Sequence, residues 1–103
     1  MAVQSTPAAP TYDSGVVTLP NTLTALTLHV VRAHTILLCN LTTSKQTVTL
    51  TDRSGVGSER MNAYPLQPNM TIPVDLGGVR MDGISWHAGA ASAVNAQLLG
   101  DIG

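Results

Sequence analysis

Charged side chains are scarce in this sequence. Asp, Glu, Lys and Arg make up only 11% of its 103 residues, about half the share found in an average globular protein. The five cationic residues are scattered, and the formal net charge is −1. No basic stripe is available to neutralise a row of phosphates, so we expect no nucleic-acid partner. A surface this neutral favours contacts with other protein chains.

Aromatic side chains are also rare, because the chain has no Phe and contains only Trp86, Tyr12 and Tyr64. Proteins that bind sugars or single strands stack them on several aromatic rings. Three rings offer few such platforms, which weakens a carbohydrate-binding interpretation. Trp86 stands in an alternating apolar segment. We therefore expect it to anchor the core, with an anchor in a protein interface as the alternative.

Cysteine occurs once, at Cys39, so no disulfide can form within the chain. Cys39 ends the apolar run 36–39 and is predicted to be buried as a small hydrophobic residue. No apolar stretch approaches the roughly 18 residues that span a bilayer, so we expect no membrane partner. The N-terminus lacks the basic and apolar regions of a secretory signal, which predicts synthesis in a cytoplasm.

Threonine is abundant, with 13 in the chain, and short runs of alternating apolar and polar residues lie between turn residues. The alternation is clearest where Met70, Ile72, Val74 and Leu76 share one face of a predicted strand. Pro73 lacks an N–H group, so this strand is expected at a sheet edge, or with that position turned outward.

The chain has the length of one domain and no internal linker. Its first residues are uncharged and non-periodic and include Pro7 and Pro10. We predict an extended N-terminal arm over residues 1–12, which contacts another chain through Pro7, Pro10 and Tyr12, with a disordered terminus as the alternative. A single β domain over residues 13–103 follows.

Seven to eight short antiparallel strands are expected, separated by turns such as Gly77-Gly78. Residues 88–99 favour a strand, although their alanines leave a short helix as an alternative. The spacing predicts an all-β fold, a small sandwich or a jelly-roll-like barrel.

Residues able to do chemistry are few and dispersed. His29, His34 and His87 are the only histidines, and none is spaced from another as metal ligands on a strand or helix would be. Ser85 and His87 share a strand face near Asp82, but no Gly-x-Ser-x-Gly turn accompanies the serine. We therefore expect no catalytic residue, no metal, no cofactor and no enzymatic activity.

Four segments in the second half of the chain follow one another in a recognisable order. They are Thr47-Val48-Thr49-Leu50-Thr51-Asp52 before a Gly-containing loop, Leu66-Gln67-Pro68-Asn69 before an alternating strand, Leu76-Gly77-Gly78-Val79-Arg80, and Ala93-Val94-Asn95-Ala96-Gln97. As a unit, residues 47–100 resemble a group of small phage virion proteins that decorate or cement the capsid. The resemblance covers about half of the chain and rests on the order of turns and strand boundaries, not on residues that carry a chemical function.

The resemblance implies a β-sandwich that forms homotrimers on the outside of an icosahedral head, with a terminal arm that reaches the coat protein or a neighbouring protomer. The expected function is therefore that of a structural virion protein, a capsid decoration (cement) protein of a bacteriophage. We expect it to be made in the host cytoplasm, to form a homo-oligomer, with a trimer favoured, and to bind the major capsid protein or another virion protein. The alternative is a carbohydrate- or receptor-binding module of a tail, collar or fibre.

Overall fold

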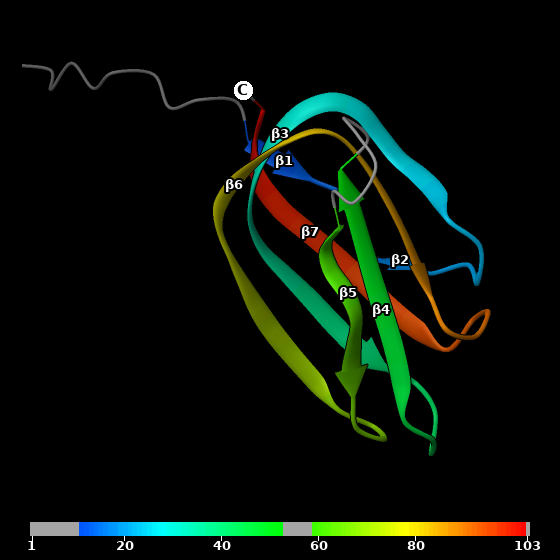
Figure 1. Cartoon of the computed structure of the whole chain (residues 1–103). Coiled ribbons are helices and arrows are strands. Elements are labelled where there is room, and N and C mark those ends of the chain that lie inside the picture. Colours follow the sequence, from blue (N-terminus) through cyan, green and yellow to red (C-terminus); the bar gives the residue numbers. More distant parts are fainter. Residues whose placement is uncertain (1–10, 53–58, 103) are drawn as a thin grey trace, which may run out of the picture.

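The computed structural model describes residues 11–52 and 59–102, which form seven β-strands (Figure 1). The predicted all-β class is confirmed, and residues 88–99 form a turn and then a strand, as favoured above. None of the described residues forms a helix long and apolar enough to cross a membrane. The strands are β1 (Thr11–Asp13), β2 (Val17–Thr18), β3 (Thr24–Asn40), β4 (Gln46–Asp52), β5 (Glu59–Leu66), β6 (Thr71–Ala88) and β7 (Val94–Ile102).

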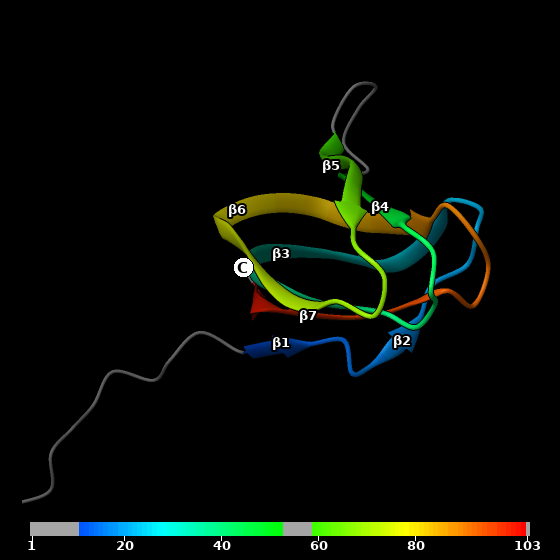
Figure 2. The same ribbon diagram turned by 90° about the horizontal axis from the view of Figure 1, so that it is seen from below.

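One antiparallel sheet, in the order β1-β7-β3-β6-β4-β5 with β2 also paired to β7, folds over on itself to give a sandwich. Residues 31–40 of β3 pair with β7, and the same stretch of β3 pairs with the first half of β6. Residues 84–88 of β6 pair with β4, and residues 84–86 also pair with the start of β3 on the other side. Figure 2 shows β6 running from the layer of β7 into the layer of β4. The long strands β3 and β6 therefore belong to both layers, and the prediction of uniformly short strands is wrong for these two.

Glycines with positive φ lie within β6 where the strand bends. Gly77 and Gly78 have φ values of 71° and 75°, which glycine adopts without the steric cost that other residues incur. Here residues 76–78 of β6 lie opposite His34 alone, a bulge that adds residues to one strand of the pair. The turn predicted at this glycine pair is therefore wrong, because the bulge bends the strand while the pairing resumes on both sides.

The core lies between the two layers. On β7 the side chains of Val94, Ala96 and Leu98 are buried and alternate with half-buried polar residues, the period expected of a strand with one face against the core. Trp86 is only 2% exposed and belongs to the same cluster. This position agrees with the predicted core role of Trp86 and leaves little of its ring for a partner.

The first half of β6 is an edge of the sheet. Among the pairings of the described residues, it pairs with β3 on one side and with no strand on the other. Pro73 stands in this half, opposite Leu37, and is exposed. The predicted edge position of Pro73 is confirmed, and its missing N–H interrupts no second ladder.

The sheet begins two residues earlier than predicted, because β1 pairs with residues 99–101 of β7. Tyr12 lies in β1, opposite Gly100, and packs partly buried against the core. Its assignment to the arm is therefore wrong, since the aromatic ring gains more by covering the sheet of its own chain than by staying extended. Pro7 and Pro10 lie outside the described residues, as do all of residues 1–10 of the predicted arm.

A buried asparagine at the end of β3 ties two loops together. Asn40 is 1% exposed. Its Nδ2 donates hydrogen bonds to the carbonyl oxygens of Ser44 at 2.8 Å, Gln67 at 3.0 Å and Leu66 at 3.3 Å. Its Oδ1 accepts bonds from the Thr42 backbone N–H at 2.9 Å and the Thr42 hydroxyl at 2.8 Å. The side chain thus supplies the partners that the loops after β3 and β5 lack.

Candidate functional site

The feature that stands out is the solvent side of three neighbouring strands, which we call the outer face. It comprises the outward residues of β6, β3 and β7 at the level of Thr35, Leu37 and Cys39. The register sets them in rows across the sheet, with cross-strand neighbours close enough to form a continuous surface. The rows are Asp75–Thr35–Leu99, Pro73–Leu37–Gln97 and Thr71–Cys39–Asn95.

Charge is nearly absent from the outer face. Asp75 is the one ionisable carboxylate in these rows, and its Oδ1 accepts a hydrogen bond from the Gly77 N–H at 2.8 Å. Leu37 is exposed at 37% of its surface, although Leu prefers the interior. The face therefore combines apolar area with neutral polar groups.

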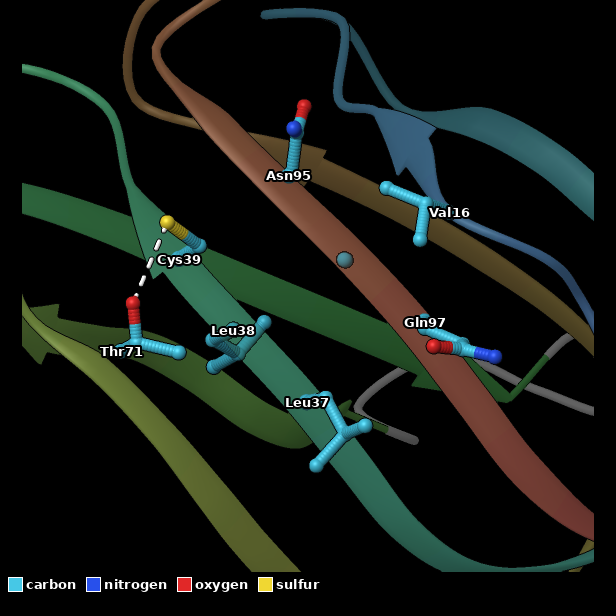
Figure 3. Close-up of a pocket in the computed structure, with 8 residues that line it drawn as sticks. Val16, Leu37, Leu38, Cys39, Thr71, Asn95 and Gln97 are labelled. Carbon is cyan, nitrogen blue, oxygen red and sulfur yellow. Dashed lines mark hydrogen bonds between the residues drawn. The ribbon is translucent and has the colours of Figure 1, made fainter.

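An apolar hollow of about 90 Å³ opens on this face (Figure 3). Side chains from three parts of the chain line it, among them Val16, Leu37, Cys39, Asn95 and Gln97. Pockets for small molecules are larger, roughly 300–1,000 Å³. The size of this hollow therefore suits a single side chain of a partner better than a sugar or a cofactor.

The segment between β1 and β2 holds Val16 at the rim of the hollow. The Ser14 N–H donates to the Leu98 carbonyl at 3.0 Å, and the Ser14 hydroxyl accepts from the Leu98 N–H at 2.8 Å. Gly15, with φ 67°, turns the chain after this clip. Val16 then stands 68% exposed beside the hollow. The hydrogen bonds to the backbone of β7 therefore fix the position of Val16 at the rim of the hollow.

A carboxylate next to the hollow is held ionised by its neighbours. The Gln97 amide donates to Asp13 Oδ1 at 2.8 Å, and the Gly15 N–H donates to the same oxygen at 2.8 Å. These bonds, that of Gln97 foremost, lower the pKa of the Asp13 carboxyl. Burial, and secondarily the charge of Asp13, raises the pKa of the Tyr12 phenol. At neutral pH this corner of the face therefore carries the negative charge of Asp13, while the phenol of Tyr12, which packs against the core, is neutral.

Cys39 corrects a prediction. The thiol is half-buried and faces the hollow, where it accepts a hydrogen bond from the Thr71 hydroxyl at 3.3 Å. The run 36–39 alternates, with Ile36 and Leu38 fully buried and the residues after each of them facing outward. The apolar run 36–39 therefore places Leu37 and the thiol of Cys39 on the surface, although its composition favours burial of all four residues.

Ser85, His87 and Asp82, which lie close together in the sequence and would have to form a relay for a serine hydrolase, do not form one. Among the hydrogen bonds of the described residues, none joins any two of Asp82, Ser85 and His87. His87 Nδ1 instead lies 3.2 Å from the carbonyl oxygen of Ala88. Within residues 11–52 and 59–102, no group of three His, Cys, Asp or Glu is placed to hold a metal ion.

The aromatic rings do not gather on the outer face. Trp86 lies in the core, while Tyr12 and Tyr64 are both partly buried against it. Leu37 and Val16, which do shape the outer face, escaped sequence reasoning. Leu37 could have been found from its place in the run of four apolar residues 36–39. Successive residues of a strand point to opposite faces, and a layer of a sandwich buries only one of its faces, so part of such a run must be exposed.

Comparison with known proteins adds no family to this geometry. No protein-family model matches the sequence, and no curated protein is detectably similar to it.

Proposed function

We propose that this chain is a structural virion protein, a capsid decoration (cement) protein that binds the outer surface of a phage head as a homo-oligomer. The observation that carries the proposal is the outer face, a sheet surface poor in charge with an apolar hollow of about 90 Å³. The resemblance of residues 47–100 to small phage virion proteins supplies the biological setting.

The chemistry of the outer face suits a stable protein contact. Interface cores are depleted in charge and close-packed, with polar groups at the rim. Leu37 and Val16 supply exposed apolar area, and the amides of Asn95 and Gln97 supply hydrogen-bonding groups at the edge of the hollow. A partner that inserts one apolar side chain there would remove this area from water, at about 25 cal/mol for each Å².

Self-association completes the proposal. A domain of about 100 residues buries a limited fraction of its surface, so subunit contacts add stability that one core does not provide. The resemblance favours a trimer. Light scattering of the purified protein should therefore give an oligomer at micromolar concentration, and a monomer with a concentration-independent unfolding transition would contradict this part of the proposal.

The test of particle binding uses two leucines that differ in place. Leu37→Asp puts a charge beside the hollow and should lower binding to capsids that lack the protein, about tenfold or more. Leu28→Asp is the matched control, because Leu28 is 67% exposed and lies outside the outer face. Thermal denaturation checks that both variants stay folded. Wild-type protein that binds no capsid would refute the function, and equal binding of both variants would refute the role of the outer face.

A further inference from the structure

Two arginines stand side by side on the same outward side of the sheet. Arg32 of β3 pairs directly with Arg80 of β6, and both side chains are exposed. Residues directly opposite in an antiparallel pair have Cβ atoms roughly 4.5–5.5 Å apart on one face. Two of the chain's five cationic residues are thus brought together from distant parts of the sequence.

The nearest carboxylate in the row is already bonded elsewhere. Asp101 of β7 lies on the other side of Arg32, and its Oδ2 is 2.8 Å from His34 Nε2. The imidazole is held against the backbone of Gly78, because a Cβ there would come within 3.1 Å of His34 Cε1. Asp101 is therefore directed towards His34.

Neither guanidinium has a partner within the described part of the chain. No side-chain hydrogen bond or ion pair within residues 11–52 and 61–102 includes Arg32 or Arg80, and the other acid nearby on β6 is the exposed Asp82. Like charges directly opposite on neighbouring strands destabilise a sheet. An anion between the two forks would remove this repulsion and could accept paired hydrogen bonds from each of them.

We propose that Arg32 and Arg80 form a carboxylate site that receives an Asp or Glu side chain of the protein to which the outer face binds. The identity of that protein as a capsid component rests on the proposed function, whereas the anion site does not. A carboxylate fits better than a nucleic-acid backbone, because Asp82 and Asp101 flank the pair and would repel a line of phosphates.

The site also lies in line with the hollow. Arg32 precedes Leu37 by five residues on β3, and both face outward because Val31, Ala33, Ile36 and Leu38 are buried. Because β3 bulges at His34, β7 spans the same interval in four residue steps, from Asp101 to Gln97, and at about 3.3 Å for each strand residue the two positions are roughly 13 Å apart. An extended partner segment with an acidic and an apolar side chain separated by about that distance would engage both.

Poly-L-glutamate and inorganic phosphate serve as probes of the full-length protein. We expect the side-chain Nε–Hε signals of Arg32 and Arg80 in ¹H–¹⁵N spectra to shift with poly-L-glutamate at lower concentration than with phosphate. Unshifted signals would overturn the site. A stronger response to phosphate would overturn the carboxylate as its ligand.

Capsid binding tests the partner. Arg32→Gln and Arg80→Gln should each lower the affinity about tenfold or more, as expected for a lost charge-assisted hydrogen bond, and should flatten its salt dependence. Lys45→Gln removes the same charge from an exposed loop residue and should leave binding within about twofold. Wild-type protein that binds capsids while both arginine variants bind equally well would overturn this inference and leave the proposed function standing. Wild-type protein that binds no capsid would overturn the proposed function, and a glutamate response would still support the anion site.

Discussion

Replacing Asn40 by Ala tests how much stability the polar end of the sandwich contributes. The side chain has two N–H donors and two acceptor positions, and the structure uses all four, with one N–H shared between two carbonyl oxygens. A typical internal hydrogen bond contributes about 0.5–1.5 kcal/mol net. Four such bonds give an expected loss of about 2–4 kcal/mol in the free energy of unfolding, with some compensation by water at the exposed loop groups.

A carboxylate at the same position separates hydrogen bonding from shape. Asn40→Asp keeps the acceptor that receives the two Thr42 bonds, but an ionised carboxylate cannot donate to the three carbonyl oxygens and would be repelled by them. Its folded-state pKa should therefore lie above the unfolded value of about 3.9. Its protonated form is the better tolerated one, so this variant should gain stability relative to wild type as the pH falls through the raised folded-state pKa towards about 4.

Trp86 provides the assay, because it is the only tryptophan and is buried in the native state. Urea titration followed by its fluorescence gives the free energy of unfolding for each variant. Asn95→Ala is the control, since among the described residues the Asn95 side chain has a single hydrogen bond, from the Thr18 hydroxyl at 2.8 Å, and its loss should cost about 1 kcal/mol or less. An Asn40→Ala protein within about 0.5 kcal/mol of wild type would refute the reasoning, because that lies below a single bond's expected share.

Three further predictions follow from the fold. A Cβ at Gly100 would collide with the backbone carbonyl of Arg32, so Gly100→Ala should cost about 3 kcal/mol in urea titration, and a near-neutral result would show that β7 can shift away from β3. The lowered pKa of Asp13 stabilises the fold above the unfolded-state value of about 3.9 and ceases to do so as the pH falls through the folded-state pKa. Gln97→Leu should therefore weaken the acid dependence of the urea midpoint, and an unchanged dependence would contradict this cause. Deletion of residues 1–10 should leave the far-ultraviolet circular dichroism and the melting temperature nearly unchanged, because the sheet begins at Thr11, while oligomerisation or capsid binding weakens; full assembly of the truncated protein would contradict the arm.

Local alternation in the sequence was sufficient to predict the strand class and much of the core. The period-2 pattern of residues 94–98 predicts which side chains of β7 are buried, and Pro73 predicts an edge, because both signals depend on neighbours in the chain. The bulge at Gly77 was misread as a turn because glycine is common to both structures. Telling them apart requires the partner strand.

The candidate site was harder to predict because it depends on register between distant strands. Nothing local to Arg32 indicates that Arg80 lies opposite it, since that pairing is set by the bulge between Ala33 and Thr35. Leu37 likewise looks like a core residue until the second layer is seen to cover only the other face of β3. A shift of one residue in this register would turn the outer face inward.

The place of β7 in the sheet has a consequence for how the protein is made. Among the described residues β7 comes last in the sequence, yet it lies inside the sheet, between β1 and β3, and its pairing with β1 joins residues about 90 positions apart, such as Thr11 and Asp101. The β4–β5 hairpin is the most local of the strand pairings. Folds dominated by such distant pairings pass through a costly search and fold in milliseconds to seconds. A nascent chain from which β7 has not yet emerged therefore lacks an interior strand, and the sandwich closes only once β7 is available to pair.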